Sequence, residues 1–124
     1  MKRLIAAATL VMLPLSAAAA PAELVCEGTL YWYGEKSGSR PISGIHILVA
    51  DETVQVSGTA LYSATYPIDR EKSDAARVVF DLGLHTGDIN RYNGKLGLVN
   101  WTDDTKTNFN NIISATCGKA DPLF

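Results

Sequence analysis

The 124 residues carry 11 basic and 13 acidic side chains, and these charges are dispersed without a cluster of Lys or Arg. Nucleic acids and anionic membrane surfaces are bound through a positive face, so neither is expected as a partner. The length suits one domain with one hydrophobic core, and no internal repeat or linker divides it.

Residues 1–22 have the layout of a secretory signal peptide, in which Lys2 and Arg3 precede an apolar run and then a run of small residues. The apolar run is too short to remain as a membrane-spanning helix. We expect cleavage between Ala19 and Glu23, which leaves residues 23–124 as a single periplasmic or secreted β domain. That mature chain is not expected to insert into a membrane.

Cys26 and Cys117 are the two cysteines of the chain, and both lie in the exported part. An isolated pair in an oxidising compartment normally forms a disulfide. We therefore expect a Cys26–Cys117 bridge between the start and the end of the domain.

Apolar and polar residues alternate along most of the mature chain, with turn residues at short intervals, and this pattern predicts an all-β protein. In the first strand, Cys26, Leu30 and Trp32 are expected to face the core, whereas Tyr31 and Tyr33 face outward. Residues 34–41 are predicted to form a polar loop. The later strands are expected over residues 45–49, 54–57, 61–68, 77–82, 87–91, 95–101 and 109–117, with Pro67 at an edge, a bulge or a strand end.

Connections of hairpin length favour pairing between strands that are neighbours in the sequence. The predicted disulfide would bring the first and last strands together and so remove the two open edges of the sheet. We therefore predict an antiparallel up-and-down barrel of about eight strands. A two-sheet sandwich with adjacent termini is the alternative.

Two stretches contain candidate binding residues. Tyr31 and Tyr33 would lie side by side on the outer face, where they could stack on a sugar ring or anchor a protein partner, or could simply cover the barrel. Asn93-Gly94 favours a tight hairpin turn that places Arg91 near the hairpin mouth. Arg91 would either pair with Asp81 or Asp88 or be presented at the barrel mouth to bind a carboxylate or another anion.

No Gly-x-Ser-x-Gly elbow and no closely spaced histidine pair occur in the sequence. We therefore predict no catalytic residue, no cofactor and no metal.

The chain resembles small exported bacterial β-proteins of unknown function in three anchors, which are Cys26-Glu27-Gly28, the run Ile89-Asn90-Arg91-Tyr92-Asn93-Gly94, and Cys117. In size, export and disulfide-tied β architecture it is also similar to the periplasmic inhibitors of c-type lysozyme. That family carries a Ser-Gly-x-x-Tyr type motif in its inhibitory loop. The nearest run here, Ser63-Ala64-Thr65-Tyr66, lacks the glycine.

The expected function is that of a non-enzymatic exported binding module of the cell envelope, with a protein or glycan partner and with hydrolase inhibition as one form. Tyr31, Tyr33 and Arg91 are its candidate binding residues, and the chain is expected to be a monomer. The alternatives are a purely structural envelope protein and, third, a minor hydrolase.

Overall fold

The computed structural model describes residues 21–120, and residues 1–20 of the predicted signal peptide lie outside the described residues. Eight strands follow one another in the chain, as the alternation predicts. They are β1 (Ala22–Trp32), β2 (Gly38–Val49), β3 (Thr53–Ser57), β4 (Ala64–Pro67), β5 (Arg77–Leu82), β6 (His85–Asn90), β7 (Lys95–Trp101) and β8 (Phe109–Lys119).

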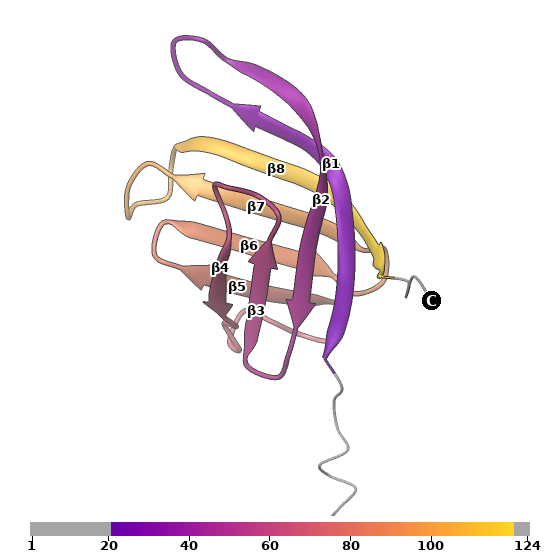
Figure 1. Ribbon diagram of the computed structural model, residues 1–124. Coiled ribbons are helices and arrows are strands. Elements are labelled where there is room, and N and C mark those ends of the chain that lie inside the picture. The colour runs from indigo at the N-terminus through magenta and orange to yellow at the C-terminus, as the bar shows by residue number, and fades with distance from the viewer. Residues whose placement is uncertain (1–20, 121–124) are drawn as a thin grey trace, which may run out of the picture.

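All eight strands belong to one antiparallel sheet in the order β4-β3-β2-β1-β8-β7-β6-β5, which curls into a nearly closed barrel (Figure 1). β1 pairs with β8, and Cys26 lies directly opposite Cys117 in that pair. The two cysteines form a disulfide. The predicted barrel and disulfide are confirmed, and the sandwich alternative is wrong.

The open seam of the barrel lies between β4 and β5, not between the two ends of the chain. Among the described residues, β4 and β5 are connected by one isolated bridge, from Ile68 just after β4 to Phe80 of β5, so the expectation that all sequence neighbours pair fails here. The loop between them covers the edge of β5 instead. The Asp69 N–H donates to the Val79 carbonyl (2.8 Å), and the Val79 N–H donates to Ser73 Oγ (2.8 Å). These bonds occupy backbone groups that an open edge would expose.

Buried side chains from all eight strands fill the barrel. Each large apolar side chain withdrawn from water contributes about 1.5–3 kcal/mol. In the middle of the core, Phe80, Gly87 and Leu98 stand in register on β5, β6 and β7. A Cβ at Gly87 would lie 2.5 Å from Phe80 Cε2, so the ring occupies the space that a side chain at position 87 would need.

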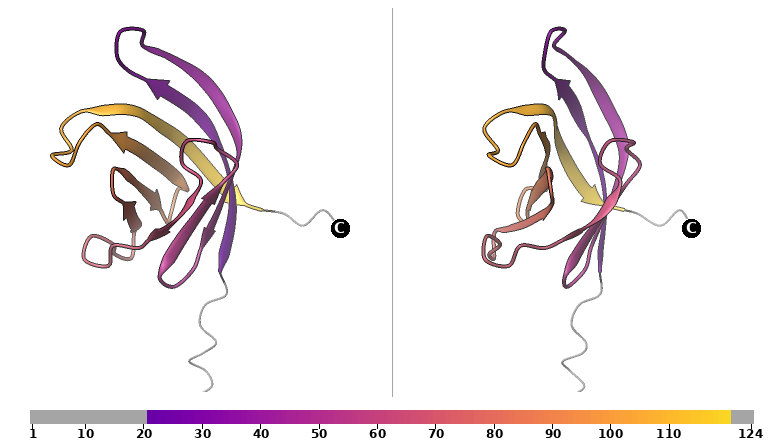
Figure 2. Two further views of the ribbon diagram at one scale, coloured as in Figure 1. Left: turned by 60° about the vertical axis from the view of Figure 1, so that its left-hand side comes forward. Right: turned by 90° about the vertical axis from the view of Figure 1, so that its left-hand side faces the viewer.

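β2 is much longer than predicted, because residues 38–41 belong to the strand and not to a loop. Gly, Ser and Pro have weak strand propensity, but pairing with β1 overrides it, and this pairing runs from Trp32–Gly38 to Ala22–Val49 with one register shift between Cys26 and Gly28. β3 pairs only with His46–Val49 of β2, so the outer edge of residues 38–44 has no neighbouring strand within residues 21–120. The β1–β2 ribbon therefore projects beyond β3 and β4 (Figure 2).

Two further differences concern strand ends. β4 is shorter than predicted because the chain turns at Thr59–Ser63, where the Ser63 N–H donates to the Thr59 carbonyl (3.2 Å). Pro67 is the last residue of β4, as expected. Leu82 at the end of β5 is exposed, although it continues the alternation of Val78 and Phe80, because it forms the last pair of the β5–β6 hairpin, beyond the core.

Candidate functional site

Aromatic side chains gather on the outer face at the upper end of β1, β7 and β8. We call Tyr31, Tyr33, Trp101 and Phe109 the aromatic patch. The Tyr33 ring centroid lies 5.0 Å from that of Phe109, which in turn lies 5.8 Å from that of Trp101. Tyr31 and Tyr33 are 37% and 45% exposed, so their rings are available to a partner.

The sheet register and two hydrogen bonds hold the patch in place. Tyr31 stands beside Ile112 of β8, and the Tyr33 N–H donates to the Asn110 carbonyl (3.0 Å). Trp101 Nε1 donates to Thr86 Oγ1 (2.9 Å), which fixes the orientation of the indole. The rings of Tyr33, Phe109 and Trp101 are therefore held by contacts within the protein, and such rings lose little entropy on binding.

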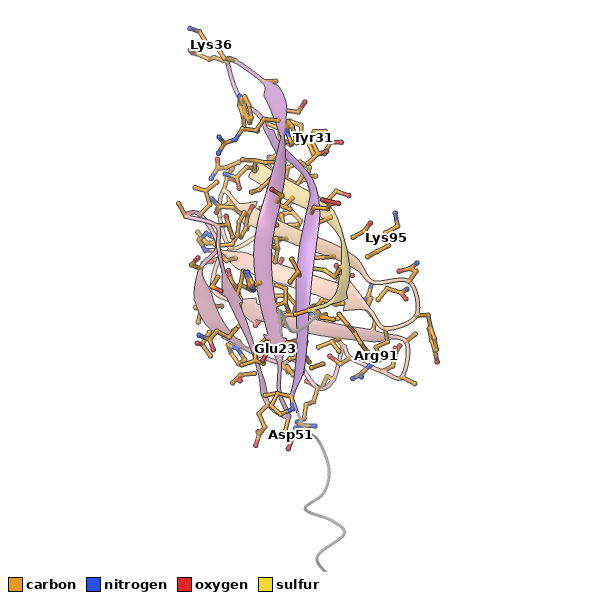
Figure 3. The ribbon with its side chains drawn as sticks, turned by 45° about the vertical axis from the view of Figure 1, so that its right-hand side comes forward. Glu23, Tyr31, Lys36, Asp51, Arg91 and Lys95 are labelled. Carbon is orange, nitrogen blue, oxygen red and sulfur yellow. A yellow bond between two sulfur atoms is a disulfide. The ribbon has the colours of Figure 1, made fainter. Side chains whose placement is uncertain are left out.

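The β1–β2 connection projects next to this patch. It consists of residues 33–37, between the end of β1 and the start of β2. Figure 3 places Lys36 at the tip of the projecting ribbon and Tyr31 on its flank. The upper end of the molecule thus combines a convex polar tip with exposed tyrosines.

The opposite end of the barrel carries a cleft of about 400 Å³, which we call the end cleft. Three connections meet there with the start of β1, because alternate connections of a meander share one end. Its lining combines aliphatic side chains, two arginines and two aspartates: Ala22, Val49, Ala50, Asp51, Ile68, Arg70, Ser73, Asp74 and Arg91.

Backbone carbonyls hold both arginines of the end cleft. Arg70 Nη2 donates to the Asp51 carbonyl (2.9 Å), and Arg91 Nε donates to the Asp74 carbonyl (3.3 Å). Within residues 21–120, neither guanidinium forms an ion pair with a carboxylate. Both cations therefore keep most of their donor groups free.

The turn after β6 explains the position of Arg91. β6 ends at Asn90, whose side-chain oxygen accepts the N–H groups of Tyr92 and Asn93 (2.9 and 3.1 Å). The Gly94 N–H donates to the Asn90 carbonyl (3.0 Å), and Gly94 takes φ +71°. The loop between β6 and β7 is therefore four residues long, and Arg91 leaves the inward alternation that ends at Ile89.

The predicted clasp between Arg91 and Asp81 or Asp88 does not form. Asp88 pairs instead with Arg77 on the outer face, with Arg77 Nη1 at 3.4 Å from Asp88 Oδ2. This pair is solvent-exposed, and such pairs contribute about 0–1 kcal/mol. Arg91 therefore stands at the barrel mouth, the second of the two positions considered for it.

The run that most resembles the lysozyme-inhibitor motif ends in a core residue. Tyr66 is 1% exposed, and its hydroxyl donates to the Tyr62 carbonyl (2.7 Å). Burial raises the pKa of Tyr66 to about 12, because the phenolate form would lose its hydration. Burial also raises the pKa of Tyr62. Its hydroxyl donates to the Asn111 carbonyl (3.1 Å) across the barrel.

The sequence-predicted binding residues thus lie on two separate surfaces. Tyr31 and Tyr33 lie together in the aromatic patch, whereas Arg91 lies in the end cleft beside Ala22, about 30 Å away along β1. Sequence reasoning missed Phe109 and Trp101 of the patch and Arg70 of the cleft. The position of Arg70 beside Arg91 could have been predicted from the barrel, because their two connections are alternate connections of a meander and therefore lie at the same end.

The described part of the chain offers neither a cluster of metal ligands nor a membrane-spanning helix. Residues 21–120 contain no group of three or more His, Cys, Asp or Glu side chains placed to hold a metal ion. The same residues contain no helix with the length and apolar character needed to cross a membrane.

Comparison with known proteins gives no family for the chain. No protein-family model matches it, and searches of curated proteins and of solved structures find no match either.

Proposed function

We propose that this chain is a non-enzymatic exported binding module of the cell envelope, periplasmic or secreted, that docks a protein partner through its aromatic patch. One observation carries the proposal: two exposed tyrosines, Tyr31 in β1 and Tyr33 in the connection that follows it, stand at the base of a projecting hairpin tip. The disulfide is compatible with an exported location.

The chemistry of the patch suits a protein surface. Tyrosine and tryptophan dominate the binding energy of many interfaces because they bury a large area with few rotatable bonds. The ring of Tyr33 packs against that of Phe109, so binding would not have to order the Tyr33 ring. The patch is therefore organised before any partner arrives.

The shape of the same end suggests the kind of partner. The tip at residues 33–37 is convex, and the active sites of hydrolases are concave clefts. Inserting such a tip into a cleft would block substrate entry, with Tyr31 and Tyr33 packing on the cleft rim. Inhibition of a hydrolase is the form of binding that this geometry favours.

The test starts with c-type lysozyme, the target of the inhibitors that the sequence resembles. The purified mature protein is titrated into the enzyme while hydrolysis of bacterial cell walls is followed. We expect inhibition that the double variant Tyr31→Ala/Tyr33→Ala weakens by about 30-fold or more, the loss typical of an interface hot spot. Tyr92→Ala is the matched control, because Tyr92 is 79% exposed at the other end of the barrel.

Unchanged lysozyme activity at a large molar excess would refute this form of the proposal. Amide chemical shifts around the patch are then recorded with soluble cell-wall glycan fragments. Shifts confined to the aromatic patch would replace the protein partner with a glycan. No response to either probe would leave the structural role described next.

A purely structural envelope role is the second candidate, and the filled interior favours it. Val54, Phe80 and Leu98 are fully buried, so the barrel lumen is occupied by its own side chains.

A further inference from the structure

We propose that the end cleft is a second binding site, distinct from the aromatic patch, that takes a carboxylate group carried on a short apolar stem. Free acids and peptide C-termini both present this chemistry. Arg91 and Arg70 would bind the carboxylate, and the aliphatic wall of the cleft would bind the stem.

The donor groups of the cleft carry the argument. A guanidinium has five N–H donors in a planar fork, and a carboxylate accepts two of them in parallel. Arg91 donates through Nε to the Asp74 carbonyl, which leaves both of its terminal nitrogens for a ligand. Arg70 is tethered at Nη2 to the Asp51 carbonyl, which leaves Nη1 and Nε. Each side chain is therefore oriented by the fold and still able to bind.

The state of the two arginines also favours an anionic ligand. Two guanidinium groups line one cavity, and within residues 21–120 no carboxylate pairs with either. A carboxylate bound in the cleft would therefore interact favourably with guanidinium groups that no protein carboxylate already pairs.

The acidic side chains of the same cleft limit the charge of the ligand. Asp74 Oδ1 already accepts the N–H groups of Ala76 and Arg77 (2.8 and 2.9 Å), which holds its charge within its own turn. Asp51 also lines the cleft. With two cations and two carboxylates, the lining has no net charge, so a single carboxylate is favoured over a phosphate or a polyanion.

The rest of the lining fits an apolar stem. Val49 and Ala50 at the β2–β3 turn and Ile68 after β4 contribute aliphatic surface that remains in the mature chain. Covering such surface contributes about 25 cal/mol per Å². The cleft thus pairs a charged side with an apolar side, as an amphipathic acid would require.

The experiment uses the disulfide-bonded mature protein and two pairs of probes. N-acetylvaline is compared with N-acetylvaline amide, and an acetylated tripeptide ending in valine is compared with its C-terminal amide. Binding is followed through amide and arginine Nε–H chemical shifts. We expect N-acetylvaline to bind with a Kd on the order of 1 mM and the amide to bind at least about tenfold more weakly.

Three variants locate the site. Arg91→Gln and Arg70→Gln should each weaken binding of the acid by about tenfold or more. Arg40→Gln is the matched control, because Arg40 pairs with Leu30 on the projecting ribbon and should leave the affinity unchanged. Retained chemical-shift dispersion in each variant shows that it still folds.

The possible outcomes distinguish a free acid from a peptide C-terminus and include results that would refute the proposal. Tighter binding of the tripeptide than of N-acetylvaline identifies a peptide C-terminus, and equal binding identifies a free acid. The proposal would be overturned if the protein bound the acid and its amide equally well, or bound inorganic phosphate as tightly as N-acetylvaline. It would also be overturned if Arg40→Gln weakened binding as much as Arg91→Gln and Arg70→Gln, or if no chemical shift changed at a ligand concentration of 50-fold the expected Kd. Binding through the aromatic patch would survive Arg91→Gln, so the two proposals fail independently.

Discussion

Replacing Gly87 by alanine tests the central packing of the barrel. The new Cβ would lie 2.5 Å from Phe80 Cε2 and 2.8 Å from Leu98 Cδ2, and both of those side chains are fully buried. Forcing a methyl group into a filled core costs about 1–3 kcal/mol. Alanine recovers about 0.5–1 kcal/mol of the backbone entropy that glycine loses in a strand. We therefore expect a net loss of about 1–2 kcal/mol in the free energy of unfolding.

A double-mutant cycle identifies the cause. Phe80→Leu removes the ring edge that meets the new methyl group, so Gly87→Ala should cost at least about 1 kcal/mol less in that background. Gly118→Ala is the control, because a Cβ at Gly118 of β8 would have no heavy atom within 4 Å. That variant should be neutral or slightly more stable.

Urea unfolding of the disulfide-bonded protein, followed by tryptophan fluorescence, measures each difference. A Gly87→Ala variant as stable as the parent would refute the packing argument. The argument would also be refuted if the destabilisations caused by Gly87→Ala and Phe80→Leu added up to that of the double variant within about 0.3 kcal/mol, because sites in contact should couple.

Three more predictions follow from the fold. Because burial raises the pKa of Tyr66 to about 12 and also raises that of Tyr62, the folded state binds more protons than the unfolded state above pH 10. The contribution of these two tyrosines to stability should therefore be constant below about pH 10 and fall between pH 10 and 12. Absorbance at 295 nm should show that they ionise only when the protein unfolds. Ionisation before unfolding would contradict their burial. The double variant Cys26→Ala/Cys117→Ala should lose about 4–5 kcal/mol, because the bridge closes a loop with a sequence separation of 91, and a loss below 1 kcal/mol by urea titration would show that it constrains the unfolded chain little. Pro41→Thr restores a backbone donor on the free edge of β2 and should promote self-association, visible by light scattering; a variant as monodisperse as the parent would show that this edge is protected otherwise.

The elements that the sequence predicts best are those with one buried face. β5 and β7 have the bounds that alternation assigns to them, and β3 differs by one residue, because burial of one face imposes a period of two. Residues 38–44 of β2 could not be assigned in the same way. Their strand conformation comes from pairing with β1 and not from their own side chains.

The candidate sites were only partly predictable. The outward positions of Tyr31 and Tyr33 follow from strand alternation, but their contact with Phe109 depends on how β1 and β8 pair. Arg91 escapes the inward face because β6 ends at Asn90, and a local pattern cannot place a strand end to one residue. The seam between β4 and β5 was also hidden, because nothing local distinguishes a loop that covers an edge from a hairpin.

The junction of β1 and β8 also has a consequence for how the chain folds. It splits the molecule into two meanders, β1–β4 and β5–β8, each built from pairings between sequence neighbours. Such local pairings form early, whereas the β1–β8 pairing joins residues from opposite ends of the domain and carries the largest loop-closure cost. Docking of two preformed halves is then the slow step of folding. Oxidation of Cys26 and Cys117 would stabilise the docked halves after they have paired. Two reduced chains that exchanged halves would give a domain-swapped dimer.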